Sequence, residues 1–211
     1  KTRMRTAAII RRTLKRAQRY LAKKEAGEDL YEPEMEALIP LLKREIPAHF
    51  HAHRADDILT AVRIAKEFHL RYSILHATSA QRIIPCLVEE NMIPIVGPSM
   101  GPAGKPETVD DSFATAGQLS KAGIQPAITT DHGVTPLWLL PFFAAQCVRE
   151  GMEEDEALRA ITIYPARSMG VEERVGSIRP GKDADIVVFN GHPFHYLTRA
   201  TAMFINGERM E

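Results

Sequence analysis

The chain has 211 residues, of which 45% are hydrophobic and 26% are charged, values ordinary for a soluble globular protein. Its 27 basic and 27 acidic side chains balance, so net charge does not point to a nucleic acid or an anionic membrane as partner. Two cysteines cannot build a disulfide framework, no apolar run reaches the length of a membrane span, and no signal peptide opens the chain. We therefore expect a cytoplasmic protein with one sizeable core, and the first residue, Lys1, is consistent with a piece of a longer protein.

The first predicted element is a basic amphipathic helix. Residues 1–24 contain ten basic and no acidic side chains. Apolar residues recur in it at helical spacing: Ile10, Leu14, Ala17 and Leu21. A basic helix can bind nucleic acid or an anionic membrane, but nothing nearby supplies a stacking arrangement of aromatic residues or a known reading motif. We therefore expect a solvated helix that ends near Gly27, followed by a second helix at 32–44.

The most informative stretch is residues 49–53, which read His-Phe-His-Ala-His. Because strand side chains alternate between two faces, the three imidazoles are predicted to share one face. A lone histidine on an edge strand is usually a polar surface residue, whereas several imidazoles together are typical of a zinc site. Two further apolar runs stop on metal-ligand residue types, at His76 and at Asp131. This favours a repeated unit of strand, ligand and helix.

The following elements continue this alternation. Helices are predicted at 55–68, 79–90, 111–122, 137–150 and 153–169, and strands at 71–76, 92–96 and 127–131. Four strand-plus-helix units in a row predict a parallel sheet, and a complete α/β barrel has eight such units, so about half a barrel is present. Ligands at strand C-termini would lie on the face where such barrels carry their active sites.

The predicted secondary structure changes near Val171, from alternating strands and helices to short strands and turns. Short strands are predicted at 175–178, 184–189 and 201–205, with a hairpin turn at Asn206-Gly207. We expect a partial barrel over residues 1–170 and part of a small C-terminal β-sandwich over residues 171–211.

Two competing signals for nucleophilic catalysis are weak. Gly97, Ser99 and Gly101 match the Gly-x-Ser-x-Gly elbow of serine hydrolases, but that elbow needs a helix directly after the serine. The prolines and glycines that follow forbid a regular helix, so we interpret the match as a coincidence in a loop. Cys86 and Cys147 lie on apolar helix faces and are predicted to be core residues.

Several motifs together carry a family resemblance. They are residues 51–58 (HAHRADDI), the strand to His76, Thr129-Thr130-Asp131, residues 160–167 (AITIYPAR) and residues 176–185 (GSIRPGKDAD). Together they resemble the amidohydrolase superfamily, and most closely its imidazolonepropionase-related branch. The resemblance covers essentially the whole chain, and the last motif is highly specific for these enzymes. It implies an α/β fold, namely strands five to eight of a (β/α)8 TIM-type barrel plus part of a small β-sandwich domain.

The resemblance also implies a function and a set of site residues. The expected activity is metal-dependent hydrolysis of C–N bonds in a cyclic amide or amide-like small molecule, by metal-activated water. His51 and His76 resemble the metal ligands that close strands five and six. Asp131 resembles the carboxylate that closes strand eight, which binds metal and accepts the water's proton as general base. His53 is expected to contact substrate, and the cofactor is expected to be one or two divalent ions, most simply zinc.

The departure from the family is large. The first barrel strand of the family carries a His-x-His pair. In this sequence the only such pairs lie in residues 49–53. Too few predicted strands follow residues 49–53 for this segment to be the first strand of a complete barrel. The 211 residues alone are therefore expected to be inactive and to bind metal weakly. Unpaired edges and an exposed apolar interior are expected to require a missing N-terminal half or self-association. Four isoleucines are predicted to lie on that interior: Ile74, Ile93, Ile95 and Ile128. The alternative function is a non-catalytic binding or scaffolding protein that keeps the fold.

Overall fold

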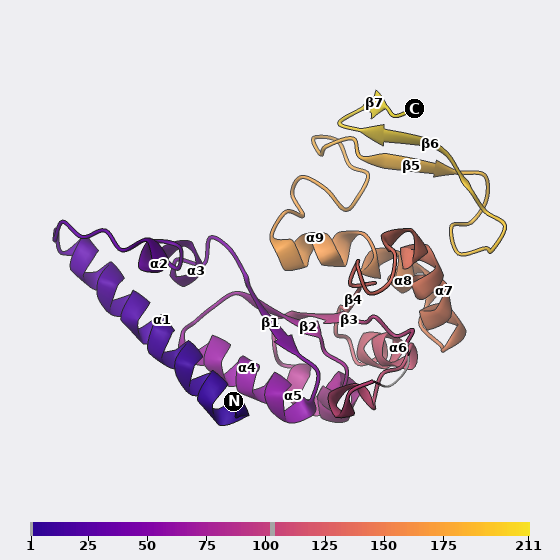
Figure 1. The fold of residues 1–211 in the computed structure, drawn as a ribbon. Coiled ribbons are helices and arrows are strands. Elements are labelled where there is room, and N and C mark those ends of the chain that lie inside the picture. The colour runs from indigo at the N-terminus through magenta and orange to yellow at the C-terminus, as the bar shows by residue number, and fades with distance from the viewer. Residues whose placement is uncertain (1, 102–103) are drawn as a thin grey trace.

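The computed structural model describes residues 2–101 and 104–211. A parallel sheet with strand order β1-β2-β3-β4 forms its centre, and an antiparallel sheet with order β5-β6-β7 follows near the C-terminus. Helices α4, α5 and α6 lie on one side of the parallel sheet, and α8 and α9 lie on the other (Figure 1). This is an α/β fold with a parallel sheet, as predicted.

The elements have the following bounds. The strands are β1 (Ala48–Ala52), β2 (Tyr72–His76), β3 (Ile93–Val96), β4 (Ala127–Ile128), β5 (Ile186–Phe189), β6 (Ala200–Ile205) and β7 (Glu208–Arg209). The α-helices are α1 (Arg3–Glu25), α2 (Pro33–Glu36), α3 (Ile39–Leu42), α4 (Ala55–Glu67), α5 (Ile84–Leu87), α6 (Ala114–Lys121), α7 (Leu140–Arg149), α8 (Glu154–Ala160) and α9 (Ile163–Met169). Short 3-10 turns are η1 (Ala80–Ile83), η2 (Pro106–Thr108) and η3 (Leu137–Leu139). Within the described ranges, none of the helices has the length and apolarity that crossing a bilayer requires.

Proline shortens several helices relative to the prediction. Three stretches expected as single helices are each divided in two: 32–44, 79–90 and 153–169. Pro40 and Pro85 stand in the first turns of α3 and α5, and Pro165 stands near the start of α9. Proline lacks the N–H that a helix interior needs but fits the first turn, so each proline favours a new helix start over continuation.

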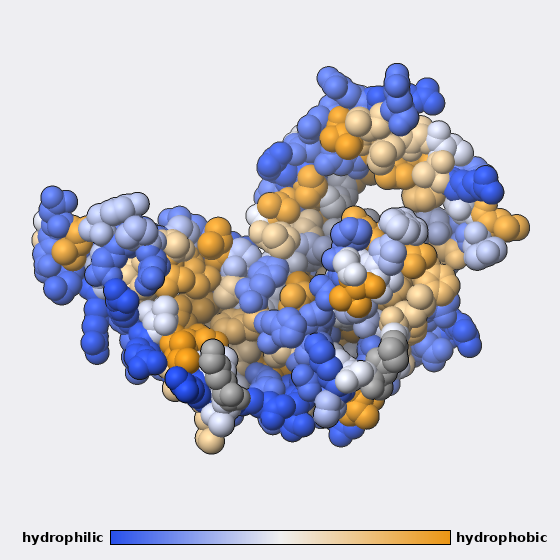
Figure 2. All heavy atoms as spheres, in the orientation of Figure 1, coloured by the Kyte–Doolittle hydropathy of each residue, from blue (hydrophilic) through white to orange (hydrophobic). Residues whose placement is uncertain are grey.

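The long helices α1 and α4 confirm their predictions and pack on each other. The face of α1 that buries Leu14 and Ala17 points inward, and its arginines form ion pairs with acidic residues elsewhere, such as Arg3 with Asp57 and Arg11 with Glu67. The outer surface around this helix is hydrophilic (Figure 2). Its positive charge is thus partly balanced within the chain, as expected for a solvated helix.

The register of the parallel sheet brings the strand ends into line. Ala52 at the end of β1 pairs with His76 at the end of β2, and His76 pairs with Val96 at the end of β3. Along β1 the burial alternates, with His49 and His51 on the exposed face. The alternation predicted for the histidine run is therefore confirmed for the part that lies in the strand, while His53 follows one residue beyond it.

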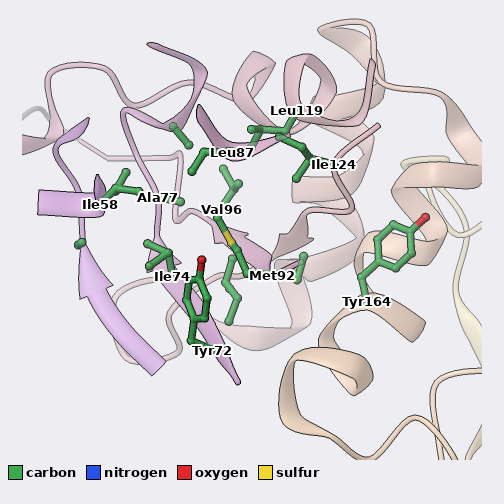
Figure 3. Packing of buried hydrophobic residues seen from close by; sticks show 14 of the residues in the cluster. Ile58, Tyr72, Ile74, Ala77, Leu87, Met92, Val96, Leu119, Ile124 and Tyr164 are labelled. Carbon is green, nitrogen blue, oxygen red and sulfur yellow. The ribbon is translucent and has the colours of Figure 1, made fainter. Parts of the chain in front are cut away.

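One hydrophobic core joins the sheet to its helices. Ile74 of β2 and Val96 of β3 meet Ile58, Leu87 and Leu119, which come from three different helices (Figure 3). Ile58, Ile74, Leu87 and Leu119 are fully buried. This core holds the sheet against its helices, and the C-terminal ends of the strands remain available to carry functional groups.

The expectation of an exposed apolar interior is wrong for the isoleucines named for it. Ile74, Ile95 and Ile128 are buried, and Ile93 is half-buried. The physical reason is that both sides of the sheet are covered. Ile74 packs on the side of α4, α5 and α6, whereas α8 and α9 fold back over the other side and contact β3 and β4. His49, on that side, lies with its Nε2 3.1 Å from the carbonyl oxygen of Ser168 in α9.

The C-terminal region differs in part from its prediction. β5, β6 and β7 form one antiparallel sheet, and Asn206 and Gly207, both with positive φ, make the predicted hairpin turn. Residues 175–178 are not a strand, because Gly176 turns there with φ 85° and lies so close to Ala166 that a Cβ would overlap it. A β-sandwich domain and a boundary near Val171 remain predictions.

The two cysteines lie in different environments. Cys147 of α7 is buried, as predicted, but Cys86 of α5 is exposed. The expected apolar helix face at Cys86 is wrong because the helix there is a single turn rather than the predicted long segment.

Candidate metal centre

The site lies at the C-terminal edge of the parallel sheet. His51 is the last residue but one of β1, and His76 is the last residue of β2. Asp131 follows shortly after the end of β4. All three line one cavity of about 360 Å³, together with His53. The side chains assigned from the sequence to metal and substrate therefore share one cavity.

The three imidazole rings are packed closely. Ring centroids lie 4.4 Å apart for His51 and His76, 4.6 Å for His53 and His76, and 5.0 Å for His51 and His53. One ring nitrogen from each residue can be chosen so that all three lie within 4.8 Å of one another. His53 thus belongs to the same cluster as the two histidines assigned as ligands.

Burial and neighbouring charge favour the neutral form of two of these rings, His51 and His53. Burial lowers the pKa of His51, and the neighbouring His76 lowers it further. Burial, with the charges of His76 and His51, lowers the pKa of His53 to about 4. A neutral imidazole has a free lone pair on one nitrogen, which is the form that binds a metal ion.

Hydrogen bonds orient two of the rings. Nδ1 of His76 lies 2.7 Å from the carbonyl oxygen of Gly97. Because a carbonyl can only accept, Nδ1 of His76 carries the proton and Nε2 carries the lone pair. Nδ1 of His53 lies 2.8 Å from Oγ1 of Thr78. Such partners fix the ring orientation before any ligand arrives.

Three residues at or just after the strand ends have left-handed backbone conformations. The φ angles are 72° at His76, 44° at Ala77 and 50° at Asp131. Non-glycine residues adopt this region infrequently, and it persists only where surrounding contacts enforce it. Here the amide of Ala77 donates to the carbonyl of Ala52 at 3.1 Å, and the amide of Asp131 donates to Oγ1 of Thr129 at 3.0 Å.

The donor set fits a divalent transition metal. Nitrogens bound to one zinc ion lie at most about 4.2 Å apart, twice a Zn–N distance of about 2.1 Å. The clustered nitrogens lie within 4.8 Å of one another, so small ring rotations bring them into range. Three imidazoles are a donor set that suits zinc and its neighbours better than calcium or magnesium. Asp131 lines the same cavity but is not among the atoms within 4.8 Å of one another.

The loop after β3 brings further polar groups into the cavity. Ser99, Lys105 and Asp111 line it, and of these the sequence analysis discussed only Ser99. Burial raises the pKa of Asp111. The helix predicted to begin at residue 111 begins at Ala114, which leaves Asp111 at the end of the Gly/Pro-rich loop that follows β3.

The same loop is anchored by the residue before Asp111. Asp110 accepts a hydrogen bond from Oγ of Ser79 at 2.7 Å and forms an ion pair with Arg82. The bond from Ser79, together with Arg82, lowers the pKa of Asp110. These contacts hold the loop to the segment that follows β2, on the rim of the cavity.

Other candidate groups lie outside the site. The nearby His132 uses Nδ1 to accept the amide of Leu137 at 3.1 Å, which closes a turn. A larger cavity of about 730 Å³ lies where Tyr72 and Ile93 begin their strands, at the opposite end of the sheet. Among the residues described, the group of side chains that could hold a metal ion lies at the other cavity, not at this one.

Known proteins resemble the chain over nearly all of its length. A model of the amidohydrolase family matches residues 10–210. The crystal structure of an amidohydrolase from Thermotoga maritima MSB8 superposes with a TM-score of 0.93 at 40% identity, covering 100% of this chain and 56% of that one.

Curated sequences of amidohydrolases and imidazolonepropionases also resemble the chain. Amidohydrolase tasK of Hapsidospora irregularis is 25% identical, over 98% of this chain and 23% of its own length. Imidazolonepropionase of Geobacillus kaustophilus is 41% identical, over 36% of this chain and 19% of its own length. The chain thus spans about a quarter or less of these two curated relatives.

Proposed function

The chain belongs to the amidohydrolase family, and from this premise we propose that it serves the metal-dependent hydrolysis of a C–N bond in a cyclic amide or amide-like small molecule. The observation that carries the proposal is the cluster of His51, His53 and His76 at the C-terminal edge of a parallel sheet, in one cavity with Asp131. In α/β barrels this edge is where catalytic groups gather.

Each residue has a proposed role. His51, His76 and Asp131 would hold the metal ion, which we propose to be zinc. When bound, such an ion lowers the pKa of water toward about 7 and polarises a carbonyl. Asp131 accepts the proton of the attacking water and returns it to the departing nitrogen. His53 contacts the substrate beside the metal, held in place through Thr78.

We further propose that the four parallel strands are half of a barrel that another segment completes. β1 pairs with β2 on one edge, and no strand pairs with its other edge in the described part of the chain. Beside β1 lies a cavity of about 260 Å³ between α1 and α4, lined by apolar groups that include Ile10, Phe50 and Ile64. An added strand on the free edge would cover this cavity and supply further ligands.

The test is a joint measurement of metal and turnover on the natural protein in full length. Metal analysis is expected to find zinc or a similar ion, and a screen of cyclic amides and small N-acyl compounds is expected to find a substrate. Asp131→Asn should remove turnover by at least about 100-fold, because the general base is lost. A protein that folds but neither holds metal nor cleaves any amide would favour the non-catalytic binding or scaffolding function instead.

A further inference from the structure

We propose that Gly97 and Thr129 are positioning residues, which together fix His76 and Asp131 relative to each other. The inference rests on the proposed function, because it assigns His76 and Asp131 to one metal site. Neither Gly97 nor Thr129 is assigned a role by the sequence motifs or by that function. The proposal follows from a connected set of contacts across the ends of β2, β3 and β4.

The first contact sets the tautomer of His76. The carbonyl oxygen of Gly97 lies 2.7 Å from Nδ1 of His76, whose side chain is buried. The hydrogen bond forces the proton onto Nδ1, so Nε2 is the nitrogen with a free lone pair. Any movement of the Gly97 carbonyl therefore changes both the direction and the tautomer of this ring.

The second contact places Gly97 directly on the backbone of Thr129. Gly97 is buried and has φ 115°, a conformation that favours glycine. A Cβ at this position would overlap the carbonyl oxygen of Thr129. The amide of Thr129 also donates to the carbonyl of Val96 at 2.9 Å, which continues the pairing of β3 with β4. Gly97 and Thr129 are thus held in one fixed arrangement.

The third contact links Thr129 to Asp131. Oγ1 of Thr129 accepts the amide N–H of Asp131 at 3.0 Å. Asp131 has φ 50°, and its carbonyl accepts the amide of Val134 at 2.8 Å. The hydroxyl of Thr129 therefore stabilises the left-handed turn that sends the Asp131 side chain into the cavity.

The simpler interpretation is that these contacts only stabilise the turns. The two interpretations differ in what they predict for metal binding, because a turn that merely stabilises the fold can be weakened without changing the ligand geometry. Thr130 provides a matched control for this comparison. It is the next residue, its side chain is buried, and its Oγ1 has no hydrogen-bond partner among the described residues.

The experiment compares Thr129→Val with Thr130→Val in the full-length natural chain. Zinc affinity is measured by competition with a chelating dye, and ligand geometry by the visible absorption of the Co²⁺ form. Thr129→Val is expected to weaken zinc binding by roughly 10–100-fold and to alter the Co²⁺ bands, as outer-shell changes generally do. Thr130→Val is expected to match the wild type in both readouts. Circular dichroism confirms that each variant is folded.

Two results would overturn the inference while leaving the proposed function intact. One is a folded Thr129→Val protein that binds zinc within twofold of a zinc-binding wild type. The other comes from ¹⁵N NMR of the metal-free wild type, where His76 is expected with its proton on Nδ1 and would instead carry it on Nε2. A wild type that binds no zinc at all would refute the proposed function, and this inference with it.

Discussion

The rings of His53 and His76 are stacked, with centroids 4.6 Å apart and planes 12° from parallel. One nitrogen of each ring, together with one nitrogen of His51, lies within 4.8 Å of the other two, so a single metal cation can bind between the rings. The stacked pair joins the end of β2 to the residue just beyond β1.

Removal of His76 should abolish tight metal binding, whereas removal of His49 should not. His76→Ala deletes a buried ring at the centre of the cluster. His49 lies on the same side of β1 as His51 but contacts Ser168 instead, so His49→Ala is the control. Zinc analysis after dialysis against a weak chelator measures the difference. Equal zinc retention by both variants would show that the cluster is not the metal site.

Core packing should be far more sensitive at Ile74 than at Ile178. Ile74 is 0% exposed and Ile178 is 83% exposed. Ile74→Ala leaves a cavity and is expected to reduce the free energy of unfolding by about 2–5 kcal/mol. Ile178→Ala should change it by less than about 0.5 kcal/mol. Urea unfolding followed by circular dichroism measures both, and similar losses in the two variants would contradict the description of the core.

The two thiols should react at very different rates. Cys86 is exposed, whereas burial raises the pKa of Cys147 from 9.0 to about 12. Because the thiolate is the reactive form, a disulfide reagent at pH 8 should modify one thiol quickly and the second only on unfolding. Cys86→Ser removes the fast phase in the control. Two equally fast thiols in the wild type would show that Cys147 is accessible.

The Cys147 thiol is expected to make the free energy of unfolding depend on pH at high pH. The native pKa of Cys147 lies above its unfolded value of 9.0, so the native state retains the proton more strongly. Its contribution is therefore fully present below pH 9 and is lost as the pH rises from about 9 toward about 12. A Cys147→Ala protein should show less of this loss in urea titrations above pH 9. An identical pH dependence in both proteins would contradict the burial of this thiol.

Ser99 should not be a nucleophile. In the described part of the chain, the nearby His53 and His76 direct Nδ1 to Thr78 and Gly97 rather than to Ser99. The next α-helix begins only at Ala114. A fluorophosphonate probe is therefore expected to leave Ser99 unlabelled, because neither the helix nor the general base of a nucleophile elbow is present. Mass spectrometry of the digested protein measures labelling at this site. Stoichiometric modification of Ser99 would overturn the interpretation of this loop.

The 211 residues by themselves are expected to associate or to bind a complementary segment. The free edge of β1 leaves backbone donors and acceptors unpaired within the described residues. Light scattering coupled to gel filtration should give a mass above that of one 23.6 kDa chain. Metal affinity should be weaker than in the full-length protein. A monomer that holds one tightly bound ion and hydrolyses an amide would refute the half-barrel proposal.

The sequence by itself determined the repeated strand and helix units and the residue types at the strand ends. Alternation in residues 49–53 placed His49 and His51 on one face, because strand side chains have a period of two. The Asn206-Gly207 turn was equally predictable, since both residues tolerate positive φ. Local patterns were sufficient wherever neighbouring residues alone decide the conformation.

Only the tertiary structure decided how the strand ends are held and what covers the sheet. The partnership of Gly97 with His76, and the place of Asp111 in the cavity, depend on segments that meet across the sheet edge. The burial of Ile95 depends on helices that fold back from far along the chain. Such contacts join residues distant in sequence, and no local period records them. The positive φ of His76 and Asp131 has the same origin, because surrounding contacts impose a conformation that these residues do not favour alone.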